Sequence, residues 1–393
     1  MIRLSPEITS FSSQPMFRIL SRVQELERFG KSVLRFELGE PDFSTPEHIK
    51  HAAIEAISAG DTKYAPSGGL FEFKVAVEDT TFISRGFRPS HNQILITPGA
   101  NSIIYFALKC VLEHGDEVVV PDPGFPTYFS AISALGGIAV PLALKPELKF
   151  SFEFEDLARL ITPRTRAIIL NSPSNPTGQQ ISPDLMNRAY YLAKKHNILI
   201  ISDEIYSRLS YDDAQFCSPS VFDECKENVL ILNGFSKAFS MTGWRLGVAI
   251  GPENIISAME SLVSTIVSCV PPFIQRAGIQ AIVGDQSDAI RMRDEYHNRA
   301  KLLVRGLNNI KGIKCSMPTG AIYAFPSIID TGLTSAEFCD YLLEKCLVSA
   351  TPGHFFGLNG EGYVRFSTVT SESDINLALE RMTKEFGAKS VHD

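Results

Sequence analysis

Six short runs of apolar, β-rich residues alternate with longer helical stretches between about residues 90 and 252. Most of these runs lack a polar residue at every second position, which is typical of strands that helices cover on both faces of a mainly parallel sheet. Helical stretches such as Ser102–His114 and Pro183–His196 separate several of the runs. The alternation predicts an α/β domain. The runs are Gln93–Thr97, Glu117–Val120, Arg166–Leu170, Ile198–Ser202, Val229–Leu232 and Leu246–Ile250.

Beyond this segment the pattern changes to that of a smaller α+β domain. The elements expected there are a charged helical stretch at about 284–311, short strands near Ala321–Phe325 and Tyr363–Ser367, and a last helix at Glu372–Phe386. A chain of 393 residues exceeds the length at which one core stops growing, so two domains are expected. We predict a large domain over residues 46–284 and a discontinuous small domain made of residues 1–45 and 285–393.

The charge and cysteine content exclude several classes of function. A net charge of −7 argues against sequence-blind binding of nucleic acid, which needs a basic surface. No stretch approaches the roughly 20 apolar residues that span a bilayer, and the first residues lack the apolar core of a secretory signal, so a cytoplasmic protein is expected. The seven cysteines are widely spaced without a CxxC pair, which predicts neither a disulfide framework nor a metal site.

Unusual residues follow the apolar runs at the points where the strands should end. Ligands of an open parallel sheet bind beyond the carboxyl ends of its strands, so these residues are expected to converge on one edge. Capping of helices would explain the glycine, asparagine and aspartate residues, but not a lysine and an acid behind such apolar strands. The segments after the first five runs are Pro98–Asn101, Pro121–Phe125, Asn171–Gly178, Asp203–Tyr206 and Asn233–Lys237.

Taken one at a time, these groups have a consistent chemistry. Gly99 and Ala100 open a helix whose N–H groups could hold a phosphate, although a plain turn would look the same. Asp203 behind a buried strand needs a cation or a hydrogen-bond donor, or it caps a helix. A lysine in a partly dry cleft, such as Lys237, can form a Schiff base, whereas most lysines are merely solvated. Arg245 could supply a fixed charge for a phosphate, and neither a dinucleotide nor a P-loop motif occurs.

The segment GFSKAFSMTGWRLG, from Gly234 to Gly247, resembles the lysine-attachment signature of the class I aminotransferases, the aspartate/aromatic-aminotransferase-like enzymes of pyridoxal-5′-phosphate (PLP) fold type I. The resemblance covers nearly the whole chain. It implies a large domain with a mainly parallel seven-stranded sheet flanked by helices, plus a smaller α+β domain. Further segments that match in the family's order are Leu38–Phe43, Lys63–Tyr64, Gly99–Asn101, Asn171–Gly178, Asp203–Tyr206 and Tyr363–Ser367.

The resemblance implies a role for each residue that contacts the cofactor ring. Lys237 would bind PLP as a Schiff base and later carry the proton from the substrate Cα. Asp203 would pair with the ring nitrogen. Tyr206 and Asn175 would hydrogen-bond the ring hydroxyl, and Phe125 would stack on the ring. Lys237, Asp203 and Tyr206 are therefore the expected catalytic residues.

The same resemblance implies residues for the phosphate and for the substrate. Tyr64 would reach the phosphate of the neighbouring subunit, so a homodimer with shared sites is expected. Arg365 would clamp the substrate carboxylate, with help from the Gly39 N–H group and with Phe125 and Asn175 also contacting the substrate. The phosphate would be held within one subunit by Gly99, Ala100, Asn101, Ser236 and Arg245.

The expected reaction moves an amino group between an L-amino acid and a 2-oxo acid in a ping-pong sequence, with glutamate and 2-oxoglutarate as the default second pair. Three segments depart from the family pattern: Ser10–Phe17, Asn101 and Thr368–Val369. They leave no obvious cation for a distal carboxylate, which favours an aromatic or other neutral side chain, as does a similarity of residues 99–101 and 233–247 to archaeal-type aromatic aminotransferases. A PLP-dependent lyase, oxidase or carbon–carbon bond-forming enzyme is the alternative. A non-enzymatic sensor domain of a transcription regulator is a third, disfavoured because no basic DNA-binding module is left over.

Overall fold

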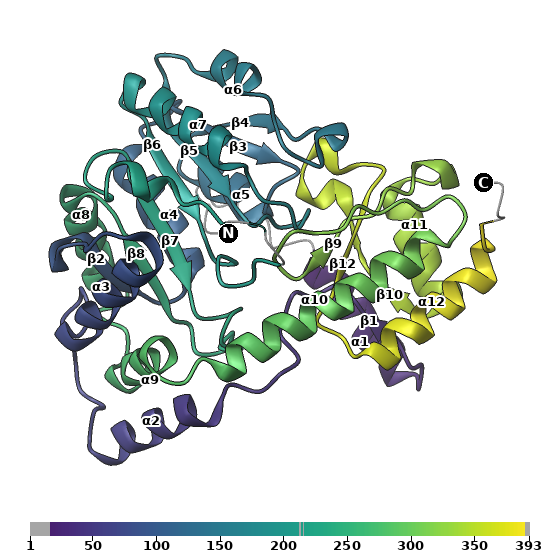
Figure 1. Cartoon of the computed structure of the whole chain (residues 1–393), viewed down its shortest axis with the longest axis horizontal. Helices are drawn as coiled ribbons and strands as arrows, with labels where there is room; N and C mark the ends of the chain where they lie inside the picture. The colour runs from purple at the N-terminus through teal and green to yellow at the C-terminus, as the bar shows by residue number, and fades with distance from the viewer. Residues whose placement is uncertain (1–15, 212–213, 215, 390–393) are drawn as a thin grey trace, which may run out of the picture.

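A mainly parallel sheet forms the centre of the molecule in the computed structural model, which describes residues 16–211, 214 and 216–389. The strands of this sheet are β2 (Ile94–Thr97), β3 (Glu117–Asp122), β4 (Ile138–Ala143), β5 (Thr165–Asn171), β6 (Leu199–Asp203), β7 (Val229–Gly234) and β8 (Gly247–Ile250). Their order is β2-β8-β7-β6-β5-β3-β4. Strand β8 is antiparallel to both of its neighbours, and the other adjacent pairs are parallel. The predicted α/β fold is confirmed (Figure 1).

All six apolar runs of the sequence are strands of this sheet, and β4 is the strand that their pattern did not reveal. It lies at the edge of the sheet, paired with β3 alone. Its sequence contains Pro141, which cannot donate a ladder hydrogen bond, and most of its side chains are exposed or half-buried. An edge strand of this kind lacks the continuous apolar character by which the central strands are recognised.

Helices cover both faces of the central sheet, because successive strand residues point to opposite sides. In β6, for example, Leu199 and Ile201 pack with one set of helices and Ile200 with the other. One face is covered by α4 (Ala100–Val111), α5 (Pro126–Ala134) and α8 (Glu253–Ile266). The opposite face is covered by α2 (Glu47–Ser58), α3 (Phe71–Arg85), α6 (Phe154–Leu160), α7 (Pro183–His196) and α9 (Pro272–Val283).

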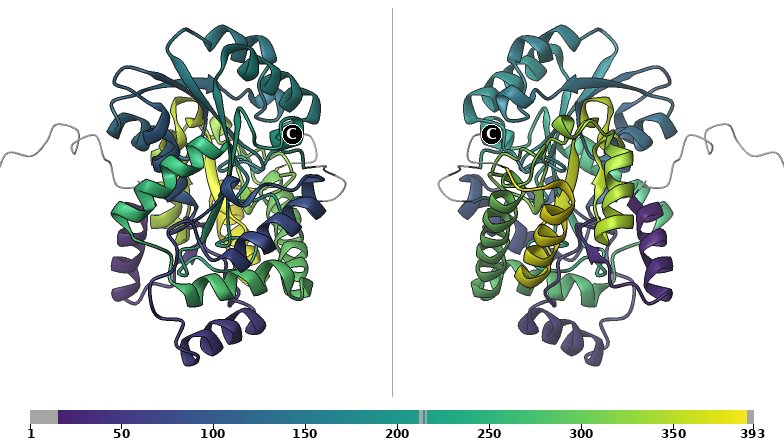
Figure 2. Two further views of the ribbon diagram at one scale, coloured as in Figure 1. Left: turned by 90° about the vertical axis from the view of Figure 1, so that its left-hand side faces the viewer. Right: turned by 90° about the vertical axis from the view of Figure 1, so that its right-hand side faces the viewer.

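A second hydrophobic core joins the two ends of the chain, with Leu34 and Phe36 packed among C-terminal residues. Figure 2 shows the purple N-terminal helix α1 (Met16–Arg28) beside the yellow and green C-terminal elements. The elements of this part are β1 (Leu34–Arg35), α10 (Ser287–Asn308), β9 (Tyr323–Ala324), α11 (Ser335–Tyr341), β10 (Val348–Ser349), β11 (Thr351–Pro352), β12 (Val364–Ser367) and α12 (Glu372–Phe386). They include a three-stranded sheet in the order β11-β12-β9 and a parallel β1-β10 pair. The domain boundaries at residues 45 and 284 stay a prediction.

The small sheet contacts the carboxyl edge of the central sheet. Strand β12 is tied to the segment after β1, since the Ser367 N–H donates to the Phe36 carbonyl at 3.0 Å. The loop after β3 is tied to the C-terminal part, since the Gly124 N–H donates to the Phe356 carbonyl at 2.7 Å.

None of the described helices combines the length and apolarity needed to cross a membrane, and the cytoplasmic location stays a prediction.

Candidate active site

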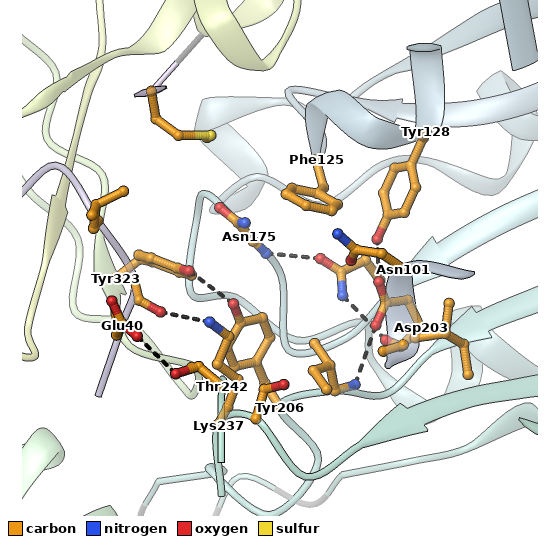
Figure 3. A pocket seen from close by; sticks show the side chains of 18 of the residues that line it. Glu40, Asn101, Phe125, Tyr128, Asn175, Asp203, Tyr206, Lys237, Thr242 and Tyr323 are labelled. Carbon is orange, nitrogen blue, oxygen red and sulfur yellow. Dashed lines mark hydrogen bonds between the residues drawn. The ribbon is translucent and has the colours of Figure 1, made fainter. Parts of the chain in front are cut away.

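A cavity of about 360 Å³ lies at the carboxyl ends of β5, β6 and β7, where the small sheet meets them. It brings together most of the residues that the sequence singled out, although those residues are spread over more than 300 positions of the chain (Figure 3). The predicted residues that line it are Gly39, Ala100, Asn101, Phe125, Asn175, Asp203, Tyr206, Ser236, Lys237, Arg245 and Arg365.

Lys237 is the amine of this cavity. It lies three residues beyond the end of β7, where the chain leaves the buried strand and enters the cavity wall. Its Nζ donates a hydrogen bond to the carbonyl oxygen of Gly39 at 2.5 Å. Burial lowers the pKa of Lys237, which makes its neutral, nucleophilic form more accessible than that of a surface lysine.

Asp203 is a buried carboxylate at the end of β6, with 5% of its surface exposed. The Tyr128 hydroxyl donates to its Oδ2 at 2.5 Å, and the Ile205 N–H donates to its Oδ1 at 3.2 Å. Burial raises the pKa of Asp203 to about 6. Among the residues that the structure describes, no lysine, arginine or histidine forms an ion pair with it. The cavity therefore presents an acid that has no cationic partner within the part of the chain that the structure describes.

Arg365 is a buried guanidinium on β12, with 2% of its surface exposed. Its Nη1 donates to Asn175 Oδ1 at 3.1 Å and its Nη2 to the Glu37 carbonyl at 2.5 Å. The guanidinium lies 4.5 Å from the ring centre of Tyr323 and 4.9 Å from that of Phe356. Its Nε is buried without a hydrogen-bond partner in the described structure, and no described carboxylate forms an ion pair with the side chain. A carboxylate from outside the chain would satisfy it.

A candidate anion site lies beside these groups, at the N-terminus of α4. Gly99, with a φ of 88°, precedes this helix, and a Cβ there would meet Arg245 Nη2 at 2.6 Å. Glycine has no Cβ, so at this position it lets the backbone lie closer to the Arg245 guanidinium than another residue type would. Arg245 donates to the Thr242 carbonyl at 2.8 Å and has no ion pair in the described part of the chain. With Ser236 on the same wall, the N-terminal N–H groups and a free guanidinium suit an oxyanion such as phosphate.

Tyr206 and Phe125 complete the walls of the cavity. The Tyr206 hydroxyl is buried and lies 2.8 Å from the Tyr323 hydroxyl, and burial raises the pKa of Tyr206. The Phe125 ring borders the cavity and packs edge-on against the Tyr128 ring, with 5.6 Å between the two ring centres. The Phe125 ring, the Tyr206 phenol and the Asn175 amide therefore lie around the same cavity as Asp203 (Figure 3).

Two predicted residues do not line the cavity of this chain. Gly99 lies just behind its wall, against Arg245. Tyr64 is 87% exposed on the loop between α2 and α3, and its predicted contact with a neighbouring subunit stays a prediction. Of the atypical segment Ser10–Phe17, residues 10–15 lie outside the described residues, and Met16 lines the cavity.

Sequence reasoning missed several lining residues, of which Tyr128 and Tyr323 contact the functional groups most directly. Tyr128 lies three residues after Phe125, at the spacing that places two side chains on the same face of a helical turn, so the helix after β3 carried a usable signal. Tyr323 belongs to a strand that the sequence did predict. Its position depends on the pairing of β9 with β12, a long-range register without a local signal.

The fold and this cavity are those of an α/β enzyme. Comparison with known proteins agrees with that class. The profile of the family "Aminotransferase class I and II" matches residues 31–382. An aspartate aminotransferase of Pyrococcus horikoshii is 39% identical over 93% of this chain and 94% of its own length. An aromatic-amino-acid aminotransferase of Thermococcus litoralis is 37% identical over 92% and 93%.

Solved structures lead to the same family. The aspartate aminotransferase of Thermus thermophilus with maleate matches with a TM-score of 0.93 and 33% identity, covering 98% of this chain and 100% of its own. The aromatic aminotransferase of Pyrococcus horikoshii matches with a TM-score of 0.87 and 37% identity, covering 92% and 99%. The chain belongs to the class I and II aminotransferases, enzymes that move an amino group between an amino acid and a 2-oxo acid. The predicted resemblance and transamination are confirmed, and these relatives do not favour the lyase, oxidase or carbon–carbon bond-forming alternative.

Proposed function

We propose that the cavity binds pyridoxal 5′-phosphate on Lys237 and transfers the amino group of an L-amino acid with an aromatic or other neutral side chain to a 2-oxo acid. One observation carries the proposal. Among the described residues, Asp203 is a buried acid without a cation in an ion pair and Arg365 is a buried cation without an acid in an ion pair, and both line one cavity with Lys237. Buried charges require partners, and a cofactor with a protonated ring nitrogen and a substrate with a carboxylate would supply both.

The remaining walls fit the rest of the cofactor. The N-terminus of α4 and the Arg245 guanidinium suit its phosphate, with Ser236 beside them. Tyr206 and Asn175 carry the hydroxyl and amide that would hydrogen-bond the ring hydroxyl, and Phe125 offers an aromatic face for the ring. We infer that these residues, with Gly99, Ala100 and Asn101, hold the cofactor.

When bound, the cofactor supplies an electron sink for the bond that breaks at the substrate Cα. Lys237 would take up the Cα proton on its Nζ and return it to the neighbouring carbon, because burial keeps its pKa below the usual range. Asp203 would hold a positive charge on the ring nitrogen, and Tyr128 would keep the acid oriented through its hydroxyl. Exclusion of water by the surrounding aromatic walls would strengthen both interactions.

The substrate side of the cavity supports the choice of substrate. Arg365 would bind the α-carboxylate through its guanidinium, assisted by the Gly39 N–H group. Among the described residues, the cations that line the cavity are Lys237, Arg245 and Arg365, and each already has a role in the proposal. Glu40 also lines the cavity and is exposed, so a second carboxylate on the substrate would find no further cation among the described lining residues. We therefore propose a neutral side chain, with glutamate and 2-oxoglutarate as the second pair in a ping-pong sequence.

A homodimer belongs to the proposal. Tyr64 is 87% exposed and Phe71, seven residues later in the chain, is 64% exposed, and large aromatic side chains that are exposed on one chain are often covered in an assembly. We propose that Tyr64 of each chain completes the phosphate site of the other.

The decisive experiment combines mass spectrometry with a single-turnover assay. Wild-type protein treated with PLP and borohydride should gain one cofactor mass on the peptide that contains Lys237, and Lys237→Ala should gain none. Turnover by the Lys237→Ala variant should fall about a thousandfold or more, because the variant loses both the covalent link to the cofactor and the proton carrier. Labelling of another lysine, or normal turnover by Lys237→Ala, would remove the assignment.

The choice of substrate is tested separately by mixing wild-type protein with a panel of amino acids and following the cofactor spectrum. Phenylalanine and tyrosine should convert the cofactor to its aminated form faster than aspartate does. Several 2-oxo acids, 2-oxoglutarate among them, should then reverse the conversion. Failure of every 2-oxo acid to reverse it would favour the non-transaminating alternative instead.

A further inference from the structure

We infer that Tyr323 is a positioning residue that links the two ends of the cavity, holding Tyr206 through its hydroxyl and Arg365 through its ring. The inference rests on the proposed function, since it concerns how these two residues meet cofactor and substrate. It assigns a role to a side chain that borders the cavity and is 2% exposed.

The hydroxyl group makes the first contact. Tyr323 Oη and Tyr206 Oη lie 2.8 Å apart, and both side chains are buried. A phenol has one proton to donate. When the Tyr206 hydroxyl donates its one proton to a group in the cavity, it can only accept a hydrogen bond from the Tyr323 hydroxyl. The bond from Tyr323 to Tyr206 and the bond from Tyr206 into the cavity then form a chain. Each bond in such a chain polarises the next, which strengthens the bond that Tyr206 makes in the cavity.

The ring makes the second contact. The Arg365 guanidinium lies 4.5 Å from the Tyr323 ring centre and 4.9 Å from the Phe356 ring centre. Hydrogen bonds hold only the terminal nitrogens of Arg365. Contact with the Tyr323 ring therefore adds to what holds the guanidinium in place, and a planar fork must be aligned to bind a carboxylate through two bonds.

Two further observations place Tyr323 between separate parts of the molecule. Tyr323 lies on β9, which pairs with the Arg365 strand β12, whereas Tyr206 follows β6 of the central sheet. The Tyr206–Tyr323 bond therefore joins the small sheet to the central one. A Cβ on Gly39 would lie 2.1 Å from Tyr323 Oη, so the hydroxyl is packed against the backbone whose carbonyl accepts from Lys237.

Tyr296 shows what a tyrosine of the same cluster looks like without such a role. It is fully buried and packs in the same small hydrophobic cluster as Tyr323 and Tyr206. Its hydroxyl has no hydrogen-bond partner among the described residues. Tyr296→Phe is therefore a matched control, because it removes a buried phenol oxygen that holds nothing.

The first test follows the pH midpoint of the visible absorption band of the bound cofactor. Tyr206→Phe should raise this midpoint by about one unit, because one hydrogen bond of roughly 1.4 kcal/mol is lost. Tyr323→Phe should raise it by about half a unit, and Tyr296→Phe should leave it unchanged. In the double variant with Tyr206→Phe, the Tyr323→Phe substitution should add nothing, because it acts through Tyr206.

The second test follows binding of 3-phenylpropionate, a carboxylate without an amino or oxo group, by calorimetry. Tyr323→Leu should weaken its binding about tenfold, through loss of the ring over Arg365, whereas Tyr323→Phe should stay within about twofold of wild type. Equal binding by the Leu variant would overturn the role of the ring.

A midpoint shift for Tyr323→Phe that matches the Tyr296 control, or that adds fully to Tyr206→Phe, would overturn the role of the hydroxyl. The Phe variant keeps the packing of the ring, so it decides this point even where the Leu variant does not fold. Wild-type protein that gains no visible band with PLP would contradict the proposed function instead, which separates the two failures.

Discussion

The two ends of the cavity are built in different ways. At the amine end, Asp203, Tyr206 and Lys237 follow two neighbouring parallel strands, β6 and β7, so one sheet edge places all three. At the carboxylate end, Arg365 and Tyr323 lie on two strands of the small sheet, and Gly39 comes from the segment after β1. The first end is a product of one continuous α/β pattern, and the second is assembled from segments that are far apart in the chain.

Under the proposed function, this difference separates the residues of the reaction from the residues that recognise the substrate. The amine end lies on a sheet whose faces are both covered by helices, so its groups are held by the central core of the molecule. The carboxylate end is held by the second core and meets the amine end through a few side-chain contacts, such as Arg365 with Asn175 and Tyr323 with Tyr206. Apart from Tyr323, which contacts both Tyr206 and Arg365, substitutions at either end should therefore change one group of measurements and leave the other nearly intact.

Asp203→Asn should give the largest effect and should be confined to the amine end. The amide cannot hold a positive charge on the cofactor ring, so the rate of the half-reaction should fall about a thousandfold, as for other losses of a buried charge partner at a reacting centre. The affinity for 3-phenylpropionate should stay within about twofold, because Arg365 is untouched. Stopped-flow absorbance and calorimetry measure the two quantities. Parallel losses in both would mean that the two ends do not act separately.

Arg365→Gln should give the reverse pattern at the carboxylate end. Loss of a buried guanidinium that pairs with a carboxylate costs about 3 kcal/mol, or roughly a hundredfold in kcat/KM for an amino acid. The absorption spectrum of the bound cofactor should be unchanged, because Lys237 and Asp203 remain. Arg365→Lys should recover only part of the loss, because an ammonium group lacks the planar fork.

An amine without a carboxylate, such as 2-phenylethylamine, is the matched control for this variant. It should react with wild type and Arg365→Gln at nearly equal rates, because it makes no use of the guanidinium. A similar loss for the amine and the amino acid would place the carboxylate clamp elsewhere.

The amine end could be predicted in part from the sequence because its groups lie at the end of an apolar strand or within three residues of it. That position singled out Asp203 and Lys237 as candidates, the family resemblance implied their roles, and both residues line the cavity. At the carboxylate end, local pattern gave a strand for Arg365 but no reason to single it out, so its role came from the family resemblance. Tyr323 was missed because the pairing of β9 with β12 decides what it faces, and strand register between distant segments leaves no local signature.

The smallest predicted effect compares the two ends in protein without cofactor, through the pH dependence of its stability. Burial raises the pKa of Asp203 to about 6, above the value of about 3.9 for an unfolded chain. Below about pH 3 the acid is protonated in both states and costs nothing. As the pH rises towards 8, the unfolded chain ionises first, so folding becomes less favourable by roughly 3 kcal/mol, most of it between about pH 4 and 8. Arg365 stays charged across this range, so the carboxylate end should contribute nothing to the change of folding stability with pH.

Urea unfolding of cofactor-free protein at several pH values between 4 and 8 measures this slope. Asp203→Asn should remove it and should gain stability relative to wild type only towards pH 8, although the same change nearly abolishes activity. Asp294→Asn, an exposed substitution on α10, should leave the slope as it is. Saturation with PLP should also flatten the curve, because a protonated ring nitrogen would compensate the carboxylate. A slope that survives in Asp203→Asn would come from other groups, and the acid at the amine end would then have its partner within the chain after all.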